Sequence, residues 1–247
     1  MKILTLIRIE LLKTKRSLAL LMLFVTPMSV VLLSTMMFIH SDGKQVAEVG
    51  WGIFWIGNFS LWGVFMLPLY IMLITVLLNQ IEHKEGGWRF MLSLPVSRVE
   101  FFLAKLLLSF IYLLVANLLL VIMIAGVTGL LTLTGYTGEG LPSPQIPLNF
   151  IFNATLAGLG ILSIQQLLSW RFKNFIVPMA TGVIGTFSVL QMASSKYWFL
   201  NPWSYTLVAT NSSDVNRSDS GVLLSLVVFA IVLLFSYFYI RQRDVTA

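Results

Sequence analysis

The sequence predicts an all-α polytopic membrane protein with six transmembrane helices, and three observations support this prediction. The chain has 247 residues, of which 57% are hydrophobic. Only 11% are charged, compared with about 25% in soluble domains. Charge-free runs such as 106–138 exceed the roughly 20 apolar residues that cross the hydrocarbon core of a bilayer. A soluble fold of this length could not bury so much apolar surface.

Charged and polar segments divide the chain into the elements of one transmembrane domain, 1–247. Residues 1–16 carry five basic side chains beside an apolar face, which predicts an interfacial helix on the cytoplasmic leaflet. The alternative is a charged flank that only orients the first crossing. We expect the crossings at about 17–39, 54–80, 102–131, 148–170, 175–192 and 221–240.

Single residues within this pattern predict local features. Pro68 lies inside the second crossing, and we expect it to kink that helix, because proline lacks the amide donor of a helical turn. Lys105 lies near the start of the third crossing, and we expect its long side chain to snorkel back to the interface. Residues 193–220 are expected to form the longest outer loop.

Basic residues are distributed unevenly between the two sides of the predicted membrane. Thirteen of the 16 Lys and Arg residues fall in the N-terminus, the loop around 81–105, the short turn after the fourth crossing and the C-terminus. The positive-inside rule then places both termini and the 81–105 loop in the cytoplasm. Only an even number of crossings is consistent with this orientation.

The 81–105 loop is the longest charged segment inside the apolar chain, and its first half predicts a turn followed by a short helix. Gly86-Gly87 allows a sharp turn, because glycine reaches backbone angles that other residues resist. Residues 88–94 then mix apolar and polar side chains over about two helical turns. A short helix lying across the membrane face would suit the docking of a soluble partner.

The second half of the loop predicts a break and a new helix. Pro95 disfavours helix at Leu94. Ser97 is followed three residues later by Glu100, which is the spacing of a capping box. The third crossing should therefore start in the cytoplasm at Ser97.

This loop resembles that of the type-2 ABC transporter permeases, and it is most similar to the small permeases of lantibiotic-immunity and bacitracin-type exporters. The resemblance rests on Glu85-Gly86-Gly87-Trp88, on Leu92-Ser93-Leu94-Pro95-Val96-Ser97-Arg98 and on Ala104-Lys105. In that family the loop is a coupling helix that sits on a separate ATPase subunit. The residues expected to contact the ATPase are then Glu82, Glu85, Gly86, Gly87, Trp88, Arg89, Leu92, Leu94, Pro95, Ser97 and Arg98.

The resemblance further implies the remaining parts of an exporter. The chain would be a multi-pass permease in the bacterial cytoplasmic membrane, as a homodimer or with a sister permease. It would bind no cofactor itself, because ATP and Mg would sit on the partner ATPase subunits. The implied substrate is amphipathic or hydrophobic, with antimicrobial peptides as a candidate class.

The composition argues against several other functions. The sequence has no cysteine, two histidines predicted on opposite sides, and no Gly-Lys-Ser/Thr phosphate loop, so a catalytic or metal-binding role is not expected. The net charge of +6 follows the membrane topology and does not indicate a nucleic-acid partner. Extramembrane segments are too short for a soluble core, so any energy source must lie on another chain.

Two questions stay open at the level of sequence. Asn58, Asn117, Gln165 and Gln166 could line a substrate path, or they could form hydrogen bonds between helices. Glu82 could meet a partner surface or be solvated. The absence of an ionisable residue deep in a crossing argues against a proton-coupled carrier. The alternative to transport is a membrane scaffold or assembly factor that docks a cytoplasmic protein.

Overall fold

The computed structural model describes residues 3–84, 97–136, 138, 140–192, 195–211 and 214–242. Every regular element in these ranges is helical, which confirms the predicted all-α class. Five helices are long and apolar enough to cross a membrane, and a shorter apolar helix covers Ile176–Met192. These six helices correspond to the six crossings expected from the sequence.

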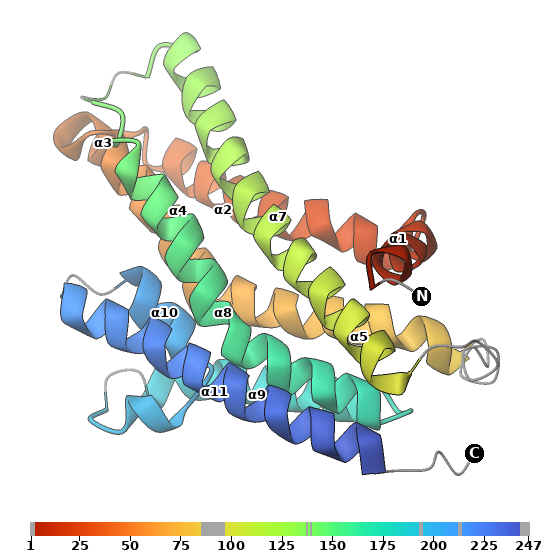
Figure 1. The fold of residues 1–247 in the computed structure, drawn as a ribbon. Helices are drawn as coiled ribbons and strands as arrows, with labels where there is room; N and C mark the ends of the chain where they lie inside the picture. The colour runs from red at the N-terminus through yellow and green to blue at the C-terminus, as the bar shows by residue number, and fades with distance from the viewer. Residues whose placement is uncertain are drawn as a thin grey trace.

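The helix α8 contacts α5, α7, α9, α10 and α11, whereas α2 packs against α5 and α7, and α1 packs against α7 (Figure 1). The elements in chain order are α1 (Ile3–Thr14), α2 (Leu18–His40), α3 (Lys44–Val49), α4 (Trp51–Leu61), the π-helix η1 (Trp62–Met66), α5 (Leu67–Lys84), α7 (Arg98–Leu133), α8 (Gln145–Arg171), α9 (Ile176–Met192), the 3-10 helix η2 (Trp198–Leu200), α10 (Ser204–Asn211) and α11 (Val215–Gln242).

The second crossing is a continuous helical path through α4, η1 and α5. Its irregularity is the π-helical segment Trp62–Met66, which ends just before Pro68. Pro68 cannot donate to the carbonyl of Val64, and its ring would clash with that carbonyl in a regular helix. A π-helical turn widens the backbone at this point, whereas the kink expected at Pro68 stays a prediction.

The third crossing, α7, begins at the predicted capping box. The Glu100 amide donates to the Ser97 hydroxyl at 3.2 Å, and the Ser97 amide donates to the Glu100 carboxylate at 2.9 Å. Hydrogen bonds from the Ser97 backbone and hydroxyl lower the pKa of the Glu100 carboxyl. With 36 residues, α7 is about 54 Å long, so it extends beyond a hydrocarbon core of about 30 Å.

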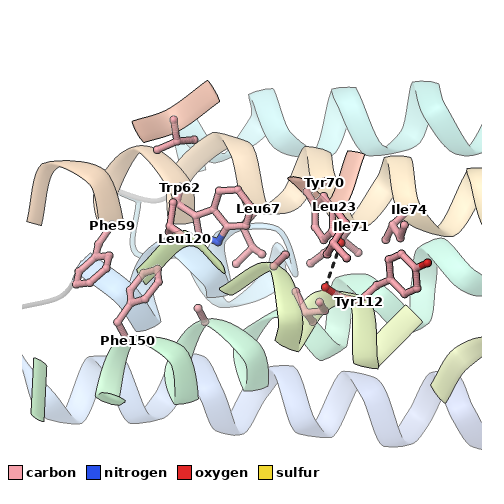
Figure 2. Packing of buried hydrophobic residues seen from close by; sticks show 14 of the residues in the cluster. Leu23, Phe59, Trp62, Leu67, Tyr70, Ile71, Ile74, Tyr112, Leu120 and Phe150 are labelled. Carbon is pink, nitrogen blue, oxygen red and sulfur yellow. Dashed lines mark hydrogen bonds between the residues drawn. The ribbon is translucent and has the colours of Figure 1, made fainter. Parts of the chain in front are cut away.

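A close-packed core joins the second, third and fourth crossings (Figure 2). The Tyr70 hydroxyl donates to the carbonyl of Tyr112 at 3.0 Å. The rings of Phe59 and Phe150 stack with centroids 3.9 Å apart. By contrast, α2, α9 and α11 expose many large apolar side chains, as expected of helix faces that contact lipid.

The region predicted as the longest outer loop differs from that expectation. Its described residues form η2 and α10, and α11 starts at Val215 rather than near 221. The helix α10 packs against η1, α8 and α11, and Ser204, Tyr205 and Val208 are buried. Thr206 and Ala209 are buried as well, so most of this short helix is enclosed by its neighbours. A segment of this length is too short to give a clear sequence signal.

Candidate functional site

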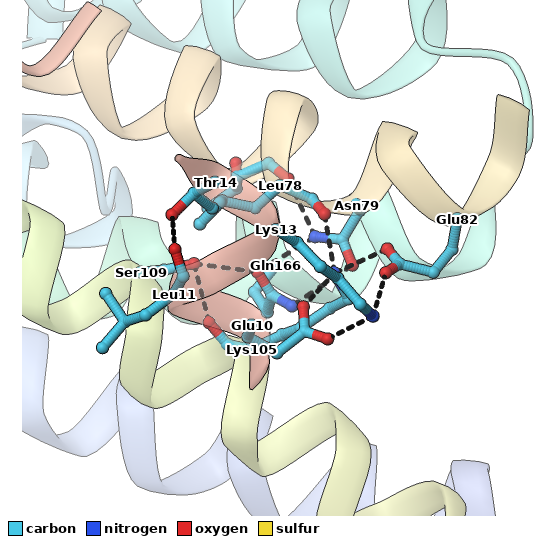
Figure 3. Close-up of polar contacts among 11 residues, drawn as sticks. Glu10, Leu11, Lys13, Thr14, Leu78, Asn79, Glu82, Lys105, Ser109 and Gln166 are labelled. Carbon is cyan, nitrogen blue, oxygen red and sulfur yellow. Dashed lines mark hydrogen bonds and ion pairs between the residues drawn. The ribbon is translucent and has the colours of Figure 1, made fainter. Parts of the chain in front are cut away.

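Four charged side chains from three helices form a closed ring of ion pairs, which we call the ion quartet. Its members are Glu10 and Lys13 of α1, Glu82 of α5 and Lys105 of α7 (Figure 3). The Lys13 ammonium lies 2.6 Å from Glu10 and 3.1 Å from Glu82. The Lys105 ammonium lies 3.0 Å from Glu10 and 2.6 Å from Glu82. Two carboxylates and two ammonium groups balance, so the ring carries no net charge.

Three members of the ion quartet are buried. The side chain of Lys105 is 0% exposed and those of Glu10 and Glu82 are 3% and 2% exposed, whereas Lys13 retains 30%. A buried charge without a partner costs several kcal/mol. Each charge here faces two opposite charges, which offsets that cost.

Lys105 has three acceptor groups around its ammonium. Besides the two carboxylates, the carbonyl of Leu78 accepts a hydrogen bond at 2.6 Å. The contact with Glu82 is a close ion pair whose angles fall outside hydrogen-bond geometry. The Phe101 ring lies 5.2 Å from the Lys105 nitrogen and 5.5 Å from that of Lys13, which adds a cation–π contact to each.

The expectation that Lys105 snorkels to the interface is wrong. Its side chain points into the protein, where Glu10 and Glu82 neutralise it. Sequence reasoning missed this arrangement because Glu10 lies 95 residues away from Lys105. The sequence held one signal of a special role for Glu10, because it is the single acidic residue among the first 16.

Lys13 is the half-buried cation of the ring. Burial lowers its pKa, but the hydrogen bond to Glu10 and the negative charges of Glu10 and Glu82 raise it more, so the pKa of Lys13 is raised overall. Lys13 therefore stays protonated well above neutral pH. Its charge holds the two carboxylates together across α1 and α5.

A layer of neutral polar side chains continues from the ion quartet toward α8. The Asn79 amide donates to the side-chain oxygen of Gln166 at 3.1 Å, and the Ser109 hydroxyl donates to the same oxygen at 3.3 Å. Ser109 also donates to the carbonyl of Lys105 at 2.9 Å. This layer, together with the ion quartet, connects α1, α5, α7 and α8.

The four residues considered for a substrate path are all fully buried. Gln166 belongs to the layer just described. Asn117 accepts from the Trp62 indole at 2.8 Å and donates to the Thr155 hydroxyl at 2.9 Å. Asn58 donates to Phe54 in its own helix. Asn117 and Gln166 thus form hydrogen bonds between helices, as one of the two sequence interpretations expected. A role of the four residues in substrate passage stays a prediction.

Gln165 faces α9. With its amide oriented so that both polar atoms are satisfied, it donates to the carbonyl of Pro178 at 3.1 Å and accepts from the amide of Gly182 at 3.1 Å. It therefore joins α8 to α9 through backbone groups.

The loop residues expected to contact an ATPase fall into two groups. Glu85, Gly86, Gly87, Trp88, Arg89, Leu92, Leu94 and Pro95 lie outside the described residues. Ser97 caps α7 and Arg98 opens it. Glu82 is directed inward in the ion quartet and is not solvated, and its contact with an ATPase stays a prediction.

One comparison with known proteins supports the resemblance found in the sequence. A search of curated proteins found no match. A family model, described as ABC-2 family transporter protein, matches residues 6–190. This range includes the whole ion quartet and the segment between α5 and α7, which carries the expected coupling helix. The chain therefore belongs to the ABC-2 transporter family, whose members are the membrane permease subunits of ABC transporters.

Proposed function

We propose that this permease couples a separate ATPase to the export of an amphipathic or hydrophobic substrate, with antimicrobial peptides as the first class to test. The ion quartet is the observation that supports coupling to an ATPase. It joins the helix that enters segment 85–96, the helix that leaves it and the N-terminal helix. Force applied to that segment by a partner would therefore reach all three helices.

The mechanism follows from the stiffness of this connection. ATP-driven closure of the ATPase would displace segment 85–96 and with it the ends of α5 and α7. Because opposite charges hold these ends to α1, the three helices would move as one unit rather than bend separately. The layer of Asn79, Ser109 and Gln166 would pass the displacement to α8.

The exposed side of α1 fits a position on the cytoplasmic leaflet. Ile9 and Leu12 are exposed there beside Arg8, Lys15 and Arg16. Apolar side chains can enter the headgroup region while the cations meet anionic lipid. In this arrangement the lipid surface supports α1 from one side and the ion quartet holds it from the other.

The apolar faces of α2, α9 and α11 leave room for a second permease as well as for lipid. We propose that the working transporter contains two permeases, identical or paired with a sister chain, and two ATPase subunits. Cross-linking in native membranes, followed by mass measurement of the complex, distinguishes a homodimer from a heterodimer.

The proposal is tested by co-expression with a Walker-motif ATPase encoded by an adjacent gene. The purified complex is reconstituted into liposomes, and ATP-dependent movement of a labelled antimicrobial peptide is measured. We expect ATPase and permease to co-purify, and the peptide to move only with ATP. A scaffold or assembly factor would bind its partner without any ATP-dependent movement of the peptide, and that result would overturn the transport proposal.

A further inference from the structure

The fold holds an open pocket of about 700 Å³ at the end of the bundle opposite the ion quartet. Its lining residues come from α4, the first turns of α8, the end of α10 and the start of α11. Figure 1 shows where these helices lie in the bundle. By the distribution of basic residues, this end faces outward. Its size falls within the range of pockets for small-molecule ligands, roughly 300–1,000 Å³.

One wall of the pocket is apolar and aromatic. The stacked rings of Phe59 and Phe150 lie beside the exposed side chains of Ile56 and Phe152. The stacking fixes both rings, so this wall is formed before any ligand arrives. Such a surface takes the hydrocarbon part of a ligand.

The other side of the pocket is polar and is held in place by α10. The Asn153 amide donates to the carbonyl of Ala209 at 3.3 Å and to the Ser218 hydroxyl at 3.4 Å. The Ser60 hydroxyl donates to the side-chain oxygen of Asn211 at 3.2 Å. These bonds join α8, α10, α11 and α4 around the pocket.

The formal charge on the pocket wall is negative. Among its described lining residues, Asp219 alone is formally charged. The nearest basic residue in sequence, Arg217, does not line the pocket and stacks on the Trp198 ring at 5.6 Å. A carboxylate beside a largely apolar wall favours a positively charged ligand over a negatively charged one.

We propose that this pocket binds a cationic amphiphile, with its apolar part against the phenylalanine wall and its positive group beside Asp219. That such a ligand is a transported substrate rests on the proposed export function, whereas the binding itself does not. The experiment below contains no ATPase, so its failure is distinct from a failure of the coupling proposal.

The test is photoaffinity labelling of the purified chain in maltoside micelles, whose headgroups are neutral. The probe is a long-chain alkylammonium that carries a diazirine, and the matched control probe is the corresponding alkyl sulfate. We expect saturable labelling by the cationic probe within residues 146–153 or 209–219, displaced by unlabelled alkylammonium but not by alkyl sulfate.

Two variants test the charge. Asp219→Asn should weaken cationic labelling roughly three- to fivefold, the size expected of one exposed ion pair. Asp214→Asn removes a nearby carboxylate that does not line the pocket and should leave labelling unchanged. Labelling spread over the lipid-facing helices without competition, equal labelling by the alkyl sulfate probe, or no effect of Asp219→Asn would overturn the proposal.

Discussion

The Lys105 ammonium of α7 lies 3.0 Å from a carboxylate oxygen of Glu10 in α1, although 95 positions separate the two residues in the sequence. This contact fixes the N-terminal helix to the start of the third crossing. Glu82 completes the connection from α5. The N-terminal helix is therefore built into the same unit as the two helices that flank segment 85–96.

Glu10→Gln should destabilise the protein. The substitution keeps the shape of the side chain but leaves two buried or half-buried cations with one carboxylate between them. Breaking a buried ion network from one side costs about 3 kcal/mol, so we expect a clearly lower midpoint in thermal unfolding of the purified protein. Glu48→Gln, at an exposed position of α3, is the control and should leave the midpoint unchanged.

Exchanging the charges of Glu82 and Lys105 should restore part of the lost stability. Lys105→Glu alone puts three carboxylates against one ammonium, and Glu82→Lys alone does the reverse. The double variant Glu82→Lys/Lys105→Glu again has two charges of each sign, but it sets like charges side by side at two contacts, Lys13 with position 82 and Glu10 with position 105. The recovery should therefore be only partial. A double-mutant cycle on unfolding midpoints should give a coupling above about 1 kcal/mol, whereas strictly additive losses would contradict a direct ion pair.

Asn117→Leu distinguishes a structural role from a substrate-path role. It removes the acceptor of the Trp62 indole and the donor to Thr155. We expect a loss of about 1–2 kcal/mol, because a buried indole donor is left unsatisfied. In the reconstituted transporter the KM for substrate should stay unchanged. A changed KM with unaltered unfolding would instead place Asn117 on the substrate path.

Gly63→Ala should loosen the packing of α10. A methyl group at Gly63 would clash with the Thr210 side chain, and overpacking of this kind costs about 1–3 kcal/mol. Thr210→Ala in the same chain should recover most of the loss. Gly57 has open space where a methyl group would lie, so Gly57→Ala is the matched control in thermal unfolding.

The sequence predicted the parts of this structure that depend on local pattern and on distance along the chain. Long charge-free runs predicted the six apolar helices. The spacing of Ser97 and Glu100 predicted where α7 starts. A buried α10 was not predicted, because eight residues carry too little periodicity to distinguish a packed helix from a loop.

The site was less predictable, because its members are distant in sequence and its chemistry depends on pairing. Lys105 alone near the end of a crossing looks like an interfacial lysine. Only the meeting of α1, α5 and α7 shows that two carboxylates neutralise it. In the same way, Gln166 is informative only beside Asn79 and Ser109.

The helices α1, α5 and α7 should move as one unit when the ATPase acts, and the distance between two spin labels measures this movement. The chain has no cysteine, so labels can be placed at the exposed Leu12 of α1 and Leu107 of α7. We expect a narrow distance between them, the same without nucleotide and with ATP, in the transporting complex. Glu10→Gln should broaden that distance and abolish transport. A change of the distance on ATP binding in the wild-type complex, or normal transport by Glu10→Gln with α1 detached, would show that the three helices do not move as one unit.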